Sequence, residues 1–368
     1  MRFCHIVTML ISMSRFGIHT PLQAGLARRQ WLASCSLLAI CLSVAPMQVS
    51  AANTKTRLSL VLDDRSSLMH LPLLMADQLG FFKAEGLEIE FVEHASQASA
   101  ISALTLGTAD VLCASYDTAL LLKQKNFDAV SVVQIARTPQ WVLGISNNHL
   151  LGYKTLADLR GKRLGIVDSE GSGQRCLSAF LSRSGVEFSQ VNLVNLNSML
   201  QALVALRSGY VDALFAADPL MTALEKNDEV TVLHNFRTLK QTQLVFSGLL
   251  PGNGLIVSQA LVEKYPQTCQ AMVSAVVRSL KWLRTARPSD LLRYMVESPV
   301  LPDRLVYLNA IDNMRESFSL DGWLSADAQQ ASLQMLGLLD PSVSATTLAW
   351  KTTVRNDFVR AAKQRFNV

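Results

Sequence analysis

The chain has 368 residues, of which 49% are hydrophobic, 17% are charged and 7% are aromatic, and its net charge is +5. This composition excludes a disordered or low-complexity protein, and the length suits two domains. Residues 1–51 hold four arginines and no acidic residue, which leaves a net charge of only +1 for the remainder. The positive net charge of the whole chain therefore does not indicate nucleic-acid binding, and we expect no nucleic-acid partner.

Residues 1–51 have the pattern of an export signal. Arg28 and Arg29 precede an uncharged run over Trp31–Pro46, and small residues stand at 49–51. The run is shorter than the roughly 20 apolar residues that a membrane-spanning helix needs. We therefore expect a cleaved signal peptide and a periplasmic protein. The arginine pair resembles a twin-arginine motif, so the Sec and twin-arginine export routes both remain open.

An internal repeat follows the signal. Ala103–Leu112 and Ala205–Leu214 share the pattern A-L-x-x-G-x-[AV]-D-[AV]-L at an offset of 102 residues. Upstream of them, an apolar strand at Leu58–Leu62 corresponds to another at Leu164–Val167. Each unit reads as strand, helix, strand, helix, strand. Because βαβ crossovers are right-handed, the repeat predicts two parallel α/β lobes.

Short apolar runs predict the other strands of these lobes, since parallel strands covered on both faces read as continuous apolar segments. Helical spacing of apolar residues predicts helices over Ala98–Leu106 and Met199–Leu206. The predicted strands are Leu87–Val92, Val111–Ala114, Val191–Leu196 and Ala213–Ala216.

Two segments are predicted to cross between the lobes. Ala136–Ser146 leads out of the first lobe and Leu244–Leu250 leads back. We assign residues 52–143 and 245–368 to lobe I, with the C-terminal helices packed on it, and residues 144–244 to lobe II. Two crossing strands form a hinge, so we expect the lobes to close when a ligand binds.

Polar loops follow six of the predicted strands. Ligands of parallel α/β sheets bind beyond the carboxyl ends of the strands. These loops are rich in Ser, Asn, Asp and Gly, which cap helices and leave backbone N–H groups available. We therefore expect a cleft between the lobes that holds a small polar molecule. The loops are Asp63–Ser67, His94–Gln97, Ser115–Thr118, Asp168–Gly173, Asn195–Ser198 and Ala217–Pro219.

Five segments within residues 57–285 carry a resemblance to a known family, and they are Pro72–Ala76, Gly80–Leu87, Leu106–Asp110, Leu156–Arg163 and Asp212–Phe215. They resemble the nitrate/sulfonate/taurine-type solute-binding proteins of ABC importers, and the chain is also similar to thiamine-precursor-type members. The resemblance implies a type II periplasmic-binding-protein fold with a two-strand hinge, no catalysis and no cofactor. It also implies an ABC permease and ATPase at the inner membrane as partners, and we expect a monomer.

The same resemblance implies a set of ligand-binding residues. In addition to the residues that the resemblance implies, we expect Asp64, Arg65 and Ser66 from the loop after the first strand, and Gln140 from the linker, to bind the ligand. The residues that the resemblance implies are Ser96, Gln97, Ser115, Tyr116, Gly171, Ser172, Gly173, Asn197 and Asp218.

Other chemistry has little support in the sequence. Gly171-Ser172-Gly173 resembles part of a dinucleotide-binding motif, but Cys176 stands where the third glycine belongs. The scattered Cys113, Cys176 and Cys269 are no disulfide framework, although either one bridge or buried free thiols fit their number. The histidines lack metal-ligand spacing, so no metal site is expected. Thiamine-pyrimidine synthases of the same fold carry clustered cysteines that this chain lacks, which favours a non-enzyme.

Two ligand charges remain in competition. Helix N-termini at 96–99 and 171–173 favour an anion, and the resemblance implies a sulfonate-, nitrate- or taurine-like ligand. Against this, Asp63, Asp64 and Glu170 suit an amine-bearing ligand such as an aminopyrimidine. Our hypothesis from the sequence is a small anion held by neutral donors. An aminopyrimidine binder, or an enzyme of the thiamine-pyrimidine synthase type, is the alternative.

Overall fold

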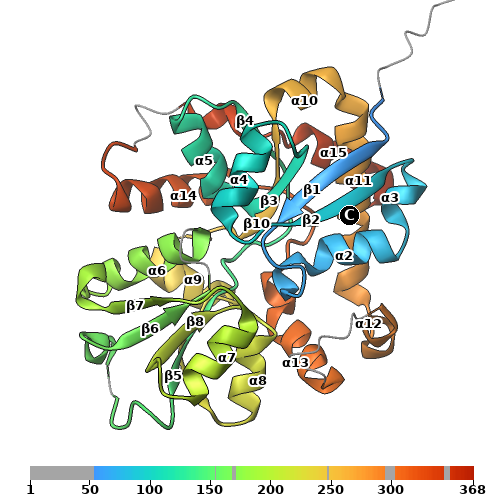
Figure 1. Ribbon diagram of the computed structural model, residues 1–368. Coiled ribbons are helices and arrows are strands. Elements are labelled where there is room, and N and C mark those ends of the chain that lie inside the picture. The colour runs from blue at the N-terminus through green and yellow to red at the C-terminus, as the bar shows by residue number, and fades with distance from the viewer. Residues whose placement is uncertain (1–53, 154, 168–170, 247, 295–302, 344–348) are drawn as a thin grey trace, which may run out of the picture. The chain divides into compact units, whose positions relative to one another are not determined.

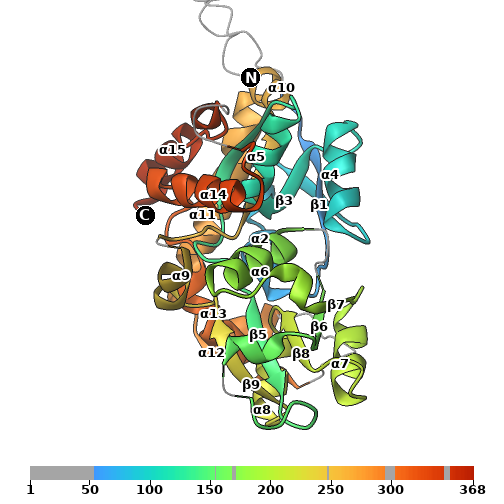
Figure 2. The same cartoon turned by 90° about the vertical axis from the view of Figure 1, so that its left-hand side faces the viewer.

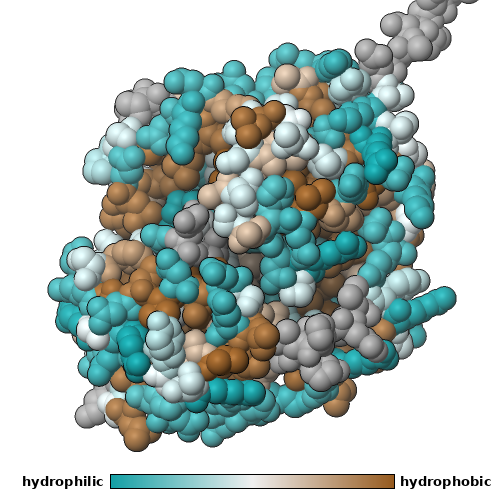
Figure 3. Space-filling view, in the orientation of Figure 1, coloured by the Kyte–Doolittle hydropathy of each residue, from teal (hydrophilic) through white to brown (hydrophobic). Residues whose placement is uncertain are grey.

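The computed structural model describes residues 54–153, 155–167, 171–246, 248–294, 303–343 and 349–368. The predicted signal peptide and the loop residues 168–170 lie outside this part of the chain. None of the described helices combines the length and the apolarity that crossing a bilayer demands. Hydrophilic and hydrophobic residues are mixed on the face of the molecule that Figure 3 shows.

Lobe I is built around a five-stranded sheet in the order β2-β1-β3-β10-β4 (Figure 1). Strand β1 pairs in parallel with β2 and β3, while β10 runs antiparallel to both β3 and β4. Every residue of β3 and β4 is buried, as expected of strands covered on both faces. The strands are β1 (Arg57–Leu62), β2 (Glu88–Glu93), β3 (Val111–Ser115), β4 (Ala129–Gln134) and β10 (Asn253–Ser258).

Lobe II repeats this arrangement in the order β7-β6-β8-β5-β9. Strand β6 pairs in parallel with β7 and β8, and β5 runs antiparallel to β8 and β9. The three strands predicted in this lobe are confirmed as β6 (Arg163–Ile166), β7 (Asn192–Asn195) and β8 (Ala213–Ala216), with ends that differ by at most one residue. The other two strands are β5 (Val142–Ser146) and β9 (Val230–Asn235).

One antiparallel strand in each sheet corrects the prediction of wholly parallel lobes. The parallel strands of both sheets end at the cleft. A chain that crosses the cleft enters the next sheet from that edge, so its first strand must run the opposite way. Strand β5 is the first strand after the outward crossing, and β10 is the first after the return.

Helices cover both sheets (Figures 1 and 2). Those of lobe I are α2 (Leu71–Gln78), α3 (Phe81–Ala84), α4 (Gln97–Thr105), α5 (Tyr116–Gln124), α10 (Gln259–Lys264), α11 (Pro266–Thr285) and α15 (Asp357–Phe366). Those of lobe II are α6 (Ser172–Arg183), α7 (Met199–Arg207), α8 (Leu220–Lys226) and α9 (Leu239–Phe246). The remaining helices of the tail are α12 (Pro288–Tyr294), α13 (Arg304–Met314) and α14 (Ala326–Leu339).

The C-terminal helices contact both lobes, which differs from the prediction that they pack on lobe I. Helix α11 packs on α2 and α15 in lobe I. Helix α13 instead packs on α8 of lobe II, and α14 contacts α5 of lobe I as well as α6 of lobe II. The tail therefore bridges the lobes on two sides.

The aspartate of the internal repeat has the same structural role in both lobes. In lobe I, Oδ2 of Asp110 accepts a hydrogen bond from the backbone N of Ser59 at 3.0 Å. In lobe II, Oδ2 of Asp212 accepts one from the backbone N of Arg163 at 2.8 Å. Each aspartate thus ties the strand that it precedes to the neighbouring strand, away from the cleft, so the repeat reports architecture and not ligand binding.

Candidate functional site

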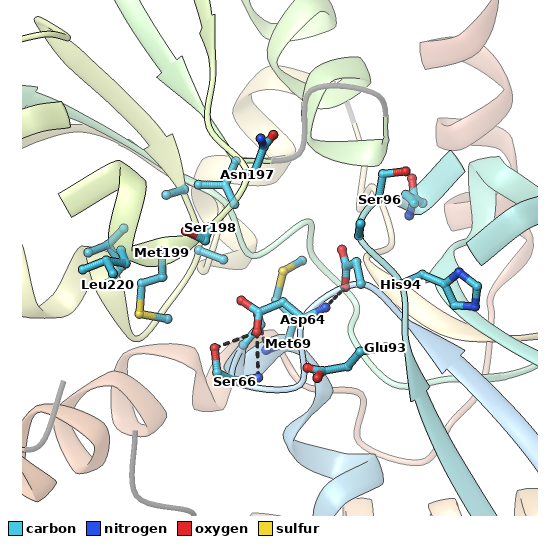
Figure 4. Close-up of a pocket in the computed structure, with 18 of the residues that line it drawn as sticks. Asp64, Ser66, Met69, Glu93, His94, Ser96, Asn197, Ser198, Met199 and Leu220 are labelled. Atoms are coloured by element: carbon cyan, nitrogen blue, oxygen red, sulfur yellow. Dashed lines mark hydrogen bonds between the residues drawn. The ribbon is translucent and has the colours of Figure 1, made fainter. Parts of the chain in front are cut away.

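A cavity of about 690 Å³ lies between the lobes, at the carboxyl ends of the parallel strands. In Figure 4, Asp64, Ser66 and Glu93 lie on the wall from lobe I, and Asn197, Ser198 and Leu220 lie on the wall from lobe II. The lining residues are Asp63, Asp64, Ser66, Ser67, Met69, Glu93, His94, Ala95, Ser96, Gln97, Trp141, Val167, Asn195, Asn197, Ser198, Met199, Leu200, Ala216, Ala217, Asp218 and Leu220.

The lobe I wall is acidic. Asp63 and Asp64 follow β1, and Glu93 ends the neighbouring β2, so the parallel pairing of these strands brings the three carboxylates to one edge. Oδ1 of Asp64 accepts hydrogen bonds from the backbone N and the Oγ of Ser66, at 2.8 and 2.6 Å. Oε1 of Glu93 accepts one from the backbone N of Arg65 at 2.6 Å. These bonds fix the loop and aim the acidic side chains at the cavity.

Asp63 has a buried histidine behind it. Its Oδ1 lies 2.8 Å from Nε2 of His70 and accepts a hydrogen bond from the backbone N of Asp64 at 2.9 Å. Burial by itself would raise the pKa of Asp63, but the hydrogen bond from His70 lowers that pKa below its ordinary value. The carboxylate therefore stays ionised at neutral pH.

Apart from Asp218, the described residues of the lobe II wall are uncharged. This wall presents the amides Asn195 and Asn197 together with apolar side chains such as Met199 and Leu220. Trp141, at the end of the outward crossing, lines the cavity and stacks on Phe215 with ring centroids 5.6 Å apart. A flat or apolar ligand body fits such a wall better than a fully hydrated ion does.

Asp218 is a carboxylate of the lobe II wall whose charge is already compensated. Its Oδ2 accepts a hydrogen bond from Arg237 at 2.9 Å, and its Oδ1 accepts one from the backbone N of Thr222, also at 2.9 Å. The second bond satisfies a backbone N–H in the first turn of α8, whose N-cap is Pro219. Asp218 therefore contributes a paired carboxylate to the wall.

The helix N-termini that suggested an anion already have hydrogen-bond partners inside the protein. At α4, Ser96 and Ser99 form a capping box, in which Oγ of Ser96 accepts from the backbone N of Ser99 at 3.2 Å. At α6, the backbone N of Ser172 donates to Oε1 of the buried Gln97 at 2.8 Å. Both bonds use donors that an anion would need.

Six of the predicted ligand-binding residues line the cavity, and two lie in a small hollow beside it. The hollow contains Ser115 and Ser172 together with Asp117 and Cys176. Oγ of Ser115 donates to Asp117, which lies in the first turn of α5 and is paired with Arg175 instead of capping the helix. The six lining residues are Asp64, Ser66, Ser96, Gln97, Asn197 and Asp218.

Five other predicted residues do not line the cavity. The guanidinium of Arg65 lies over the ring of Phe91, 5.2 Å from its centroid, and Arg65 does not line the cavity. Gly171 is the N-cap of α6, and Gly173 is buried within its first turn.

Tyr116 and Gln140 are core residues. The hydroxyl of Tyr116 lies 2.7 Å from Oγ1 of Thr353, and burial raises the pKa of Tyr116 to about 12. Nε2 of Gln140 donates to Oγ of Ser317 at 2.7 Å. Both side chains therefore form hydrogen bonds to residues of the C-terminal tail.

Glu93 is a charged lining residue that the sequence reasoning missed, and Met69 and Trp141 are apolar ones. Glu93 is the last residue of an alternating strand, and side chains at such carboxyl ends were already expected to face the cleft. The predicted loop began one residue later, at His94. A predicted loop that began at the final residue of the strand would have included Glu93.

The described lining residues therefore bear four carboxylates and neither lysine nor arginine. Arg237 compensates Asp218, and His70 contacts Asp63, which leaves Asp64 and Glu93 without a cationic partner among the described side chains. Such a site attracts ligands with N–H donors or a positive charge, and it repels small anions.

The sequence profile of the NMT1/THI5 like family matches residues 67–289. The chain is 25% identical over 273 residues to the formylaminopyrimidine-binding protein of Halalkalibacterium halodurans, covering 71% of this chain and 77% of that protein. It is 30% identical over 182 residues to a Haemophilus influenzae protein provisionally assigned to thiamine biosynthesis (48% and 56% coverage). A Legionella pneumophila 4-amino-5-hydroxymethyl-2-methylpyrimidine phosphate synthase is 23% identical over 140 residues (38% and 43%). The chain thus spans about half the length of the latter two relatives.

Solved structures share the two-lobe fold. A Bordetella bronchiseptica protein superposes with a TM-score of 0.80 at 30% identity, covering 85% of this chain and 99% of that one. The alkanesulfonate-binding protein of Xanthomonas axonopodis has a TM-score of 0.66 at 19% identity (83% and 99%). The periplasmic nitrate-binding protein of Synechocystis has a TM-score of 0.63 at 14% identity (86% and 91%). The expected periplasmic-binding-protein fold is confirmed.

Proposed function

The chain belongs to the NMT1/THI5-like family, and from that premise we propose that it is an exported binding component of an ABC importer. It captures a small ligand between its lobes and delivers that ligand to a membrane permease and ATPase. The two-lobe fold, shared with periplasmic sulfonate- and nitrate-binding proteins, supports this function.

We further propose that the ligand is an amine-bearing nitrogen heterocycle of the aminopyrimidine class. The observation that carries this choice is the lobe I wall, where Asp63, Asp64 and Glu93 face a cavity without a lysine or arginine among its described lining residues. Exocyclic amines and protonated ring nitrogens donate to carboxylates, while Trp141 and Met69 offer apolar contacts to a ring. A formylaminopyrimidine-binding relative points the same way.

Calorimetry and thermal-shift measurements on the purified mature protein test the ligand class. We expect 4-amino-5-hydroxymethyl-2-methylpyrimidine to bind and to raise the melting temperature, and taurine and nitrate to have no effect. Asp64→Asn and Glu93→Gln should each weaken pyrimidine binding by about tenfold or more, because each removes a charge-assisted acceptor.

Glu90→Gln is the matched control for these variants. Glu90 lies on the same strand as Glu93 but forms an exposed ion pair with Arg57, away from the cavity. Its binding should match that of the unmodified protein. Binding of taurine or nitrate in place of the pyrimidine would favour the anion hypothesis and would overturn the assignment of the ligand.

A second candidate function is catalysis, because one relative is named a pyrimidine phosphate synthase. Mass spectrometry separates the two functions. A pyrimidine phosphate synthase forms its product from other compounds, so incubation of the protein with a cell extract should generate the pyrimidine phosphate if the protein is such an enzyme, whereas a binding protein generates none.

A further inference from the structure

His70 is a buried histidine directly behind the acidic wall of the cavity. It ends the short helix η1 (Leu68–His70), and only 1% of its surface is exposed. Its Nε2 lies 2.8 Å from Oδ1 of Asp63, and its Nδ1 lies 3.3 Å from Sγ of Cys113 on β3. The ring therefore connects a cavity-lining carboxylate to the core of lobe I.

The Cys113 sulfur determines where the ring carries its proton. If the thiol donates to Nδ1, a neutral ring must hold its proton at Nε2. If the sulfur accepts from Nδ1 instead, the ionised Asp63 still requires a proton at Nε2, so the ring is an imidazolium with both nitrogens protonated. In both states, the Nε2–H of His70 donates to Asp63.

Asp63 consequently has one fixed oxygen and one open oxygen. Its Oδ1 is held by His70 and by the backbone N of Asp64. No hydrogen bond from a described residue reaches Oδ2, and 35% of the side chain is exposed. Because Asp63 lines the cavity, the second oxygen is available to a ligand.

We propose that His70 is a positioning residue of the ligand site, which holds the Asp63 carboxylate so that its outer oxygen accepts a hydrogen bond from a ligand nitrogen. Cys113 acts through His70 by fixing the ring. This inference rests on the proposed function, because it requires a ligand that donates to carboxylates.

The electrostatics of the buried ring agree with this role. Burial by itself would lower the pKa of His70, but the Cys113 sulfur and the Asp63 carboxylate raise that pKa well above its ordinary value. Among the described residues, these two are the titratable groups in contact with the ring. The stability that they provide is complete below about pH 6.5, the ordinary pKa of a histidine, and is lost as the pH rises through the raised pKa.

A mutant cycle with Asp63 tests the proposal. The probe is 4-amino-5-hydroxymethyl-2-methylpyrimidine, titrated by calorimetry between pH 5.5 and 9. We expect His70→Leu to weaken binding by about tenfold or more, since it removes the donor that holds Asp63. His70→Gln keeps a neutral N–H donor and should restore part of the affinity without the pH dependence of the histidine.

Coupling to Asp63 separates positioning from simple packing. Asp63→Asn should weaken binding as much as His70→Leu does, and the double variant should lose little more. Fully additive effects would overturn the proposal, as would His70→Leu binding within twofold of the unmodified protein. If His70→Leu does not fold, the same cycle with His70→Gln gives the answer. His149→Gln, a change far from the cavity, is the control.

A ligand-independent measurement separates this proposal from the proposed function. NMR titration of labelled histidine follows the His70 pKa, which should fall in Asp63→Asn and in Cys113→Ala. If the pyrimidine fails to bind but the pKa falls, the ligand assignment alone is wrong. A His70 pKa that is unchanged in Asp63→Asn overturns the positioning role.

Discussion

Arg237 is a buried cation that pairs with a cavity-lining carboxylate without itself lining the cavity. Its side chain is 2% exposed and lies between Asp218, which lines the cavity, and Glu225, at 2.9 and 2.8 Å. Burial, together with the charge of Asp218, keeps the pKa of Glu225 above its ordinary value even though the neighbouring guanidinium lowers it. The arginine therefore permits two carboxylates inside lobe II.

We expect Arg237→Met to reduce the free energy of unfolding by about 3–5 kcal/mol, because it leaves Asp218 buried without its cation. Urea denaturation monitored by circular dichroism measures this loss. The matched control is Arg207→Met, which breaks the pair with Glu229 at a side chain that is 52% exposed. That exposed pair should contribute no more than about 1 kcal/mol. Equal losses in the two variants would contradict the argument.

Sequence reasoning at the residue scale succeeded where the backbone position decides the outcome. Asp64 and Asn197 follow strand ends, so the topology alone brings them to the cavity. It did not find the partners of Arg65 or Tyr116, because a ring contact and a hydrogen bond to Thr353 join segments far apart in the chain. The role of His70 depends on three segments at once and has no local signature in the sequence.

At the scale of elements, the internal repeat predicted most strands of both sheets, since duplicated patterns reinforce each other. The antiparallel strands β5 and β10 were not assigned to a sheet, because β5 lies within the predicted outward crossing Ala136–Ser146 and β10 follows the predicted return. The direction of a strand follows from the path of the crossing segments.

Gly252 lies where these crossing segments meet. Its backbone N donates to the carbonyl of Ala136 at 3.0 Å. A Cβ at this position would lie 2.3 Å from the carbonyl oxygen of Thr138, which cannot move without displacing the other crossing. Only a glycine allows the two segments to approach this closely.

We therefore expect Gly252→Ala to destabilise the protein by about 1–3 kcal/mol, through strain in the crossing. Gly248→Ala is the control, because the nearest atom to its added Cβ is the Cβ of Ala331, at an ordinary 3.5 Å. Denaturant midpoints of the two variants provide the measurement. A Gly252→Ala midpoint that matches the control would show that the crossing relaxes freely.

At the scale of the whole two-lobe body, direct contacts join the lobes across the cleft. Nε of Arg175 on α6 donates to Asp117 on α5, and another nitrogen of the same guanidinium donates to Oγ1 of Thr118 at 3.1 Å. The backbone N of Leu68 donates to the carbonyl of Asp218 at 3.1 Å. These bonds must break if the lobes open, so they stabilise the closed arrangement.

The Arg175–Asp117 pair should therefore contribute to affinity without contacting the ligand. The apparent dissociation constant equals the intrinsic constant divided by the closed fraction. We expect Arg175→Met to raise the dissociation constant of the pyrimidine by about tenfold, which corresponds to roughly 1.4 kcal/mol. Combining it with Asp117→Asn removes the carboxylate that the single variant leaves buried, and should keep the loss of affinity while restoring stability.

Small-angle X-ray scattering tests whether this loss comes from opening of the lobes. Without ligand, Arg175→Met should have a larger radius of gyration than the unmodified protein, and saturating pyrimidine should reduce the difference. Arg183→Met is the control on the same helix, because Arg183 donates to the carbonyl of Val245 within lobe II.

The C-terminal helices α13 and α14 also bridge the lobes, through contacts that do not involve Arg175. If those helices alone hold the lobes together, Arg175→Met will leave both the radius and the affinity unchanged, and the hinge motion predicted from the two crossings will be wrong.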